Sequence, residues 1–201
     1  MMKLIITRHG ESEENSLGIL QGLLPGKLNE KGRQQAEKLG QRLSKEKIDI
    51  VYCSPVSRCQ ETLDIIRKHI NPSIPIIVSN LIQERDFGKL SGKSWNEINF
   101  DDLDIDSDEN KQLGVESLGE LSQRTQKFID EVKSKHPNQT VLVVSHSNPL
   151  RMVFAHLLHM TFLEVLEKIK IKNASLSILE ITDEAKALMI NYTSYLVEIK
   201  E

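Results

Sequence analysis

The chain has 201 residues and a mass of 22.9 kDa, which at roughly 150 residues per domain predicts one domain over 1–201. Its 26 Lys and Arg against 29 Asp and Glu give a net charge of -3, so no overall basic field is present to bind nucleic acid. Apolar runs stay far below the ~18 residues that a transmembrane helix needs, so we expect no membrane span. The two cysteines are too few for a disulfide framework, and the first residues lack the pattern of a signal peptide, so a reduced, cytoplasmic setting is expected.

Four short runs are rich in β-forming residues. Their continuous apolar character is typical of strands that are buried on both faces, as in a parallel sheet covered by helices. The four runs are 3–7, 48–53, 74–79 and 140–145.

Segments with helical spacing of apolar residues lie between these strands. They cover 29–47, 56–70 and about 117–136, and a fourth helix begins near Pro149 and runs through Leu157. The alternation predicts an α/β three-layer sandwich with a mostly parallel central sheet flanked by helices. Two later runs, 175–182 and 187–192, alternate apolar and polar residues and predict a C-terminal hairpin on the sheet edge, which could support a homodimer.

One region, 88–116, departs from the alternation of strands and helices and is expected to form a small cap insertion. It contains a short helix around Trp95 and an acidic stretch, 101–109, which either is a solvated surface segment or closes over a pocket. The acidic stretch lacks the glycine and the closing glutamate of a calcium loop. Three aromatic residues near the cap either form a small satellite core or line a pocket: Phe87, Trp95 and Phe100.

Charged and titratable side chains follow the predicted strands. Ligands of open α/β sheets bind beyond the carboxyl ends of the strands, and these ends are expected to place two arginines, two histidines and one carboxylate at one edge. The five residues are Arg8, His9, Arg58, Glu84 and His146.

These residue types indicate phosphate chemistry. Arginine forks pair two donors with phosphate oxygens, so Arg8 and Arg58 are interpreted as a clamp. Cations near His9 would keep its imidazole neutral and nucleophilic, and His146 could donate a hydrogen bond to the transferring phosphoryl group. The negative charge of a phosphate would favour the protonated form of Glu84, which could then protonate the leaving oxygen.

Six blocks in order along the chain resemble those of the histidine phosphatase superfamily, also called the phosphoglycerate mutase-like family. The first is the Arg-His-Gly-Glu run at 8–11 with Asn15, and together the blocks cover most of the chain from Lys3 to about His156. The others are Leu28-Asn29 with Gly32, Ser54-Pro55 with Arg58 and Thr62, Glu84 with Gly88, Gly114 with Glu116-Ser117, and Ser145-His146.

The resemblance implies a phosphoglycerate mutase-like fold and a phosphatase that hydrolyses small phosphomonoesters through a phosphohistidine on His9. It implies that Arg8, Arg58 and His146 form the phosphate pocket, that Asn15 assists, that Glu84 is the proton donor, and that no metal or other cofactor is required. The glycine that usually follows the second histidine is replaced by Ser147, whose backbone N–H can still face the substrate.

Other functions remain as alternatives. A cofactor-dependent phosphoglycerate mutase would share the core, and the Asn148 and Leu150-Arg151 positions resemble the mutase version of that block. A non-catalytic phosphate-binding module is the second alternative, although all five site residues are present. A cysteine phosphatase is disfavoured because only four residues separate Cys53 from Arg58. The pair His156 and His159 lacks a third metal ligand nearby.

Overall fold

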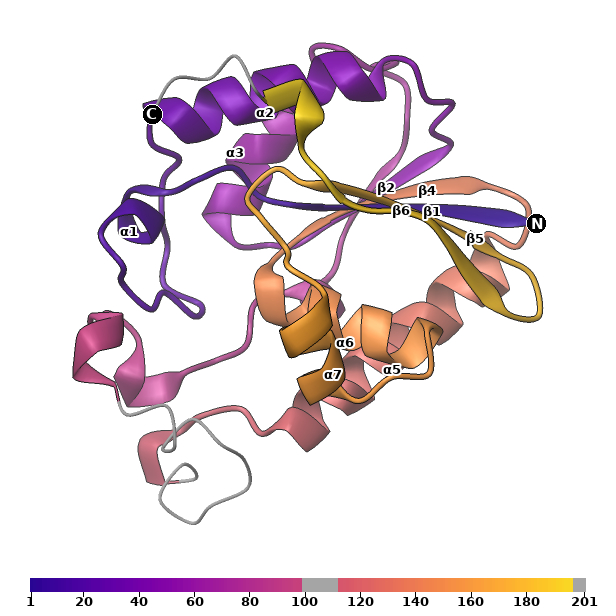
Figure 1. Cartoon of the computed structure of the whole chain (residues 1–201). Coiled ribbons are helices and arrows are strands. Elements are labelled where there is room, and N and C mark those ends of the chain that lie inside the picture. The colour runs from indigo at the N-terminus through magenta and orange to yellow at the C-terminus, as the bar shows by residue number, and fades with distance from the viewer. Residues whose placement is uncertain (99–111, 197–201) are drawn as a thin grey trace.

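The computed structural model describes residues 1–98 and 112–196, which form a six-stranded sheet with helices on both faces (Figure 1). The sheet order is β3-β2-β4-β1-β5-β6. Strands β1 to β4 pair in parallel, β5 is antiparallel to β1, and β6 is antiparallel to β5. The strand bounds are Met2–Arg8 (β1), Ile50–Cys53 (β2), Ile76–Val78 (β3), Thr140–Ser145 (β4), Leu176–Ile181 (β5) and Ala185–Tyr192 (β6). The predicted mostly parallel sheet and the C-terminal edge hairpin are confirmed.

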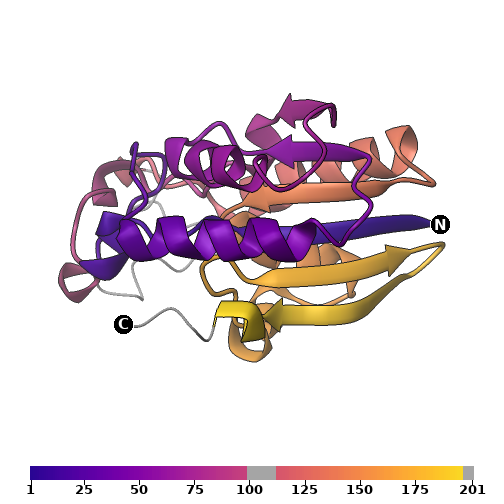
Figure 2. The same ribbon diagram turned by 90° about the horizontal axis from the view of Figure 1, so that it is seen from above.

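Two layers of helices enclose the sheet. Helices α2 (Glu30–Leu43) and α3 (Ser57–Ile66) cover one face, which Figure 2 views from above. Helices α5 (Leu118–Lys135), α6 (Ser147–Leu157) and α7 (Phe162–Lys168) cover the other. Within the described residues no single helix is long and apolar enough to cross a membrane, and α6 and α7 pass that test only as a pair bent by 111°.

The central strand β1 shows why the sheet needs both layers. Leu4 and Ile6 belong to the apolar cluster that includes α5 and α6, whereas Ile5 belongs to the cluster with α2 and α3. Successive strand side chains point to opposite faces, so an uninterrupted apolar run buries both. The three-layer sandwich therefore follows from this strand composition.

Strand β3 departs from the prediction. It is shorter than the predicted run, lies at the sheet edge, and leaves Val78 54% exposed, so the expected burial on both faces is wrong for this strand. The short helices α1 (Glu13–Ser16) and α7 were not expected. At four and seven residues they are too short to show a helical period in the sequence.

The described part of the 88–116 region contains two short 3₁₀ turns, η2 (Gly88–Leu90) and η3 (Trp95–Glu97). The second is the helix expected around Trp95. Phe87 packs in a small separate cluster, which confirms a satellite core. The cluster comprises Leu20, Phe87, Leu90, Ile98 and Val115. Phe100 and the acidic stretch 101–109 lie outside the described residues.

Candidate active site

The carboxyl ends of three parallel strands meet at one edge of the sheet. Arg8 of β1 pairs with Ser145 of β4, and Cys53 of β2 pairs with Val144, so the residues that follow these strands emerge side by side. A cavity of about 550 Å³ lies at this edge. Six of the seven predicted site residues line it: Arg8, His9, Asn15, Arg58, Glu84 and Ser147. The seventh, His146, lies directly beside His9.

The hydrogen bonds of His9 fix the tautomer of its ring. Nδ1 lies 2.7 Å from the carbonyl oxygen of Gly10, which can only accept, so Nδ1 carries the proton. Nε2 is then unprotonated, and its lone pair accepts a hydrogen bond from Arg58 Nε at 3.2 Å. Nε2 is therefore the nitrogen that can act as a nucleophile.

Burial and charge keep this ring neutral. His9 is 1% exposed, and burial lowers its pKa well below the ordinary value, with Arg58 and Arg8 lowering it further. The sequence predicted the effect of the cations, but burial is the larger cause. A neutral ring with an available lone pair is the reactive form for attack on phosphorus.

Arg8 remains a cation despite its burial. Desolvation is the main cause that lowers its pKa to about 10, which still leaves it charged near neutral pH. Nη1 donates to the carbonyl oxygen of Ile171 at 3.0 Å, while the buried Nε has no acceptor among the described residues. A phosphate oxygen would satisfy such a donor.

Arg58 is fixed more firmly than the sequence indicated. Besides the contact to His9, Nη1 donates to the carbonyl of Leu24 at 3.1 Å and Nη2 to that of Gly22 at 2.9 Å. These bonds use three of the five N–H groups that a guanidinium offers. Two N–H groups remain for a phosphate, and the guanidinium is held in place beside the nucleophile.

Two glycines allow the loop after β1 to pack closely on the start of α2. A Cβ on Gly10 would lie 2.4 Å from the carbonyl oxygen of Gly32, and one on Gly32 would lie 1.9 Å from that of Glu11. Both contacts are with backbone, so neither side could move aside cheaply. Thr62 of α3 accepts a bond from the Gly10 N–H at 3.1 Å. The first, second and third blocks of the motif thus meet in space to hold His9.

His146 is fully buried and its ring centroid lies 5.1 Å from that of His9. Burial is the main cause that lowers its pKa well below the ordinary value, with Arg58 and the other nearby cations adding to it. Its Nε2 lies 2.8 Å from Ser54 Oγ and 3.3 Å from Cys59 Sγ. Ser54 Oγ also accepts from the Val56 N–H, and its hydroxyl proton can donate to Nε2, an arrangement that places the ring proton on Nδ1.

Removing the Ser54 hydroxyl should disturb this tautomer without removing any group that contacts substrate. We expect Ser54→Ala to lower kcat about tenfold, since one buried hydrogen bond contributes on the order of 1 kcal/mol, with a smaller change in KM. The exposed Ser44→Ala variant is the matched control. Steady-state kinetics with ¹⁵N NMR of the His146 ring checks this. An unchanged kcat with an unchanged ring spectrum would contradict the positioning role.

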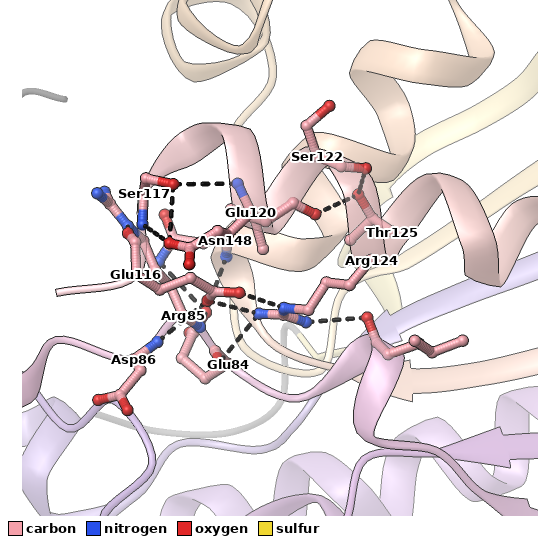
Figure 3. A network of polar contacts seen from close by, with 12 residues as sticks. Glu84, Arg85, Asp86, Glu116, Ser117, Glu120, Ser122, Arg124, Thr125 and Asn148 are labelled. Atoms are coloured by element: carbon pink, nitrogen blue, oxygen red, sulfur yellow. Dashed lines mark hydrogen bonds and ion pairs between the residues drawn. The ribbon is translucent and has the colours of Figure 1, made fainter. Parts of the chain in front are cut away.

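Glu84 is held by one of its two carboxylate oxygens. Oε1 accepts from the Arg85 N–H at 3.0 Å and from the backbone N–H and side-chain amide of Asn148 at 3.2 and 3.3 Å (Figure 3). Among the described residues Oε2 has no hydrogen-bond partner, so it can carry the proton. Asn148 comes from α6, so the second-histidine block orients the carboxyl group.

Arg124 of α5 supports the segment that carries Glu84. Its guanidinium donates to both carboxylate oxygens of Glu116 and also to the carbonyls of Leu81 and Glu84, at 2.9 and 3.1 Å (Figure 3). Glu116 Oε2 in turn accepts from the Asp86 N–H. The Gly114–Ser117 block of the motif thus has a positioning role, because it pairs with Arg124 behind the carboxyl group.

Asn15 and Ser147 complete the predicted set. Asn15 Oδ1 accepts from Asn173 Nδ2 at 3.1 Å and from the Ser12 N–H at 3.3 Å, and Asn15 lines the cavity, where its amide N–H groups can donate to a ligand. Ser147 begins α6, and its hydroxyl accepts a hydrogen bond from Arg151. The structure therefore brings together the seven predicted site residues.

The outer part of the cavity is apolar. Phe87 and Trp95 line it. Both alternatives from the sequence hold for Phe87, which also packs in the satellite core, whereas Trp95 lines the cavity without belonging to that cluster. Helix α7, which the sequence did not predict, adds a further wall. Its contribution is Phe162, Leu163 and Leu166.

The sequence indicated no contact or catalytic role for several residues of the site. Arg85 and Arg151 line the cavity, Ser54 bonds to His146, and Asn173 donates to the His9 carbonyl at 3.1 Å. The position of Ser54 right after a strand was a usable signal. Asn173 follows no predicted strand, so no signal in the sequence pointed to its contact with His9.

A neutral histidine with an unprotonated Nε2, two flanking arginines and a carboxyl group with one oxygen unpaired among the described residues define a site for phosphoryl transfer. The nucleophile, the charge stabilisation and the proton donor all come from side chains of this chain. Such a site can move a phosphoryl group to Nε2 and then to water.

Comparisons with known proteins agree with this class of site. Residues 4–192 match the family model of the histidine phosphatase superfamily (branch 1). The chain is 35% identical to Phosphoserine phosphatase 1 of Hydrogenobacter thermophilus over 205 residues, covering 98% of this chain and 96% of that protein.

Solved structures show the same fold. Bacillus stearothermophilus YhfR superposes with a TM-score of 0.85 at 26% identity, covering 98% of this chain and 100% of that one. A mutant phosphoserine phosphatase from Entamoeba histolytica in complex with phosphoserine superposes with a TM-score of 0.82 at 25% identity, with the same coverage. The chain belongs to the histidine phosphatase superfamily and is a phosphomonoester hydrolase, as its sequence predicts.

Proposed function

We propose that the protein hydrolyses small phosphomonoesters carrying a carboxylate, of which phosphoserine is an example, through a phosphohistidine on His9 and without a metal. The observation that carries this proposal is the lone pair of His9 Nε2, which lies between cations at the base of the cavity. We expect the protein to act in the cytoplasm, where its two free, buried cysteines would stay reduced.

The reaction has two steps. In the first, His9 Nε2 forms a bond to phosphorus as the ester oxygen leaves, and that oxygen takes the proton held on Glu84 Oε2. In the second, the resulting carboxylate accepts a proton from water, whose oxygen attacks phosphorus and releases inorganic phosphate and free His9. Arg8 and Arg58 stabilise the charge that develops on the phosphoryl oxygens in both steps.

The charge of the cavity supports a substrate with a second anionic group. Four arginines line it, and Glu84 is the one carboxylate among the described lining residues. The Glu84 carboxylate and a phosphate dianion would together balance three of these four cations. The remaining positive charge favours a carboxylate on the leaving group, and the relative with 35% identity is a phosphoserine phosphatase. The four arginines are Arg8, Arg58, Arg85 and Arg151.

A pair of substrates tests this proposal. O-Phosphoserine and O-phosphoethanolamine differ only by the carboxylate, and both should be assayed by phosphate release in the presence of a chelator. We expect kcat/KM to be at least about tenfold higher for phosphoserine, because a charge-assisted hydrogen bond contributes about 1.5–3 kcal/mol.

Three outcomes would contradict parts of the proposal. Equal kcat/KM values would exclude recognition of the carboxylate, and loss of all turnover in the chelator would exclude the metal-free mechanism. Conversion of 3-phosphoglycerate to 2-phosphoglycerate faster than release of phosphate would instead favour the mutase alternative.

A further inference from the structure

A second cavity of about 500 Å³ lies next to the catalytic one and shares only Arg8 and Arg151 with it. Its other walls come from the start of α2, from the segment that leads from α7 into β5, and from the residues that follow β6. A volume of this size is within the range of small-ligand sites. Apart from Arg8 and Glu11, the residues that line this cavity have no role in the catalytic mechanism or in the motif blocks.

The lining of this cavity is strongly basic. Lys31, Lys170 and Lys172 contribute ammonium groups in addition to the two shared arginines, and Glu11 is the one carboxylate among the described lining residues. The whole chain has a net charge of -3, so this concentration of cations is a local feature. We refer to this cavity as the lysine pocket.

The positive charges of the lysine pocket are not balanced within the described part of the chain. The Glu11 carboxylate already accepts a bond from Asn29 Nδ2 at 2.8 Å and lies 3.5 Å from Lys31 Nζ. Lys170 and Lys172 are exposed and have no ionic partner among the residues described. Clustered like charges repel one another, so an anion at this place would relieve that repulsion.

The two shared arginines also lack partners on one atom each. Arg8 Nε and Arg151 Nε are buried and have no acceptor within the described ranges. Such unpaired donors are rare in folded proteins and are explained where a ligand supplies the acceptor. Both arginines line the two cavities, so an anion in either cavity could supply such an acceptor.

We propose that the lysine pocket binds a small polyanion, such as a di- or tricarboxylate, at a site distinct from the catalytic cavity. Several anionic groups are required because several cations converge on a concave, water-accessible space, where a single charge pair contributes little. Since Arg8 and Arg151 face both cavities, an anion in the lysine pocket weakens the attraction of these arginines for the substrate phosphate. By linkage, bound substrate lowers the affinity of the lysine pocket for the polyanion by the same factor.

Citrate is the probe for this site, measured by isothermal titration calorimetry at fixed ionic strength. We expect one citrate to bind per chain and the double variant K170Q/K172Q to weaken it about tenfold. The variant K127Q/K133Q makes the same charge change on exposed lysines of α5 and should leave citrate binding unchanged. Neither pair of lysines lines the catalytic cavity, so kcat should stay within twofold of wild type in both variants.

Kinetics distinguishes this site from competition at the catalytic cavity. Saturating citrate should raise KM to a plateau in the wild type, and K170Q/K172Q should need about tenfold more citrate for half of this effect. A KM that rises without limit would place citrate in the catalytic cavity and overturn the proposal, as would equal affinities in the two double variants or the absence of binding. Calorimetry measures citrate binding without turnover. Its result therefore tests the lysine pocket independently of whether the proposed phosphatase function is correct.

Discussion

Replacing His9 with alanine should abolish turnover, lowering kcat by at least about 10⁴-fold. No other described histidine combines an unprotonated ring nitrogen with a place in the lining of the catalytic cavity, since the neighbouring His146 is fully buried and is not among the lining residues. The measurement is phosphate release under single- and multiple-turnover conditions. A phosphoenzyme stable to alkali and labile to acid should form in the wild type and be missing in the variant.

The matched control is His159→Asn. His159 is exposed and has a backbone φ of 53°, a conformation that asparagine also tolerates, so this variant should retain wild-type kinetics. Circular dichroism should show that both variants are folded. A folded His9→Ala protein with substantial turnover would refute the assignment of the nucleophile.

Replacing Glu84 with glutamine should slow hydrolysis most for those substrates whose leaving group must be protonated in order to depart. General acid catalysis contributes about 10²–10⁴-fold, so we expect a loss of that size on alkyl phosphates such as phosphoserine. The loss on p-nitrophenyl phosphate should be under about tenfold, because its leaving group departs without protonation. Glutamine retains an oxygen that can accept from Arg85 and Asn148, so the fold of the segment is preserved.

Glu167→Gln provides the comparison, because this exposed carboxylate of α7 does not line the catalytic cavity. This variant should change neither the rate on phosphoserine nor the rate on p-nitrophenyl phosphate. Equal losses of Glu84→Gln on the two kinds of substrate would mean that the carboxyl group has an electrostatic or structural role and that another group supplies the proton.

The sequence was sufficient to predict which residues converge, because parallel strands end at the same edge of a sheet. Once the strands ending near Thr7, Cys53 and Ser145 were recognised, the charged residues after them had to be neighbours. The core predictions succeeded for the same reason, since an apolar run on a central strand must be covered on both faces.

What the sequence could not give is the set of contacts that orient those residues. Arg58 donates to the carbonyls of Gly22 and Leu24, and Arg124 donates to that of Glu84. A backbone carbonyl is present at every position, so no residue type marks it as an acceptor. Edge strand β3 was misjudged because its apolar residues do not reveal that it has only one neighbour.

The loop that carries the nucleophile depends on residues from distant parts of the chain. The Ala174 N–H lies 3.0 Å from the carbonyl oxygen of Arg8 and 3.1 Å from that of His9, and Thr62 supports Gly10 from another helix. During translation, the nucleophile leaves the ribosome among the first residues, but its anchor at Ala174 follows long afterwards. A chain that stops short of Ala174 therefore holds the complete Arg-His-Gly motif without two of the hydrogen bonds that fix the reactive loop.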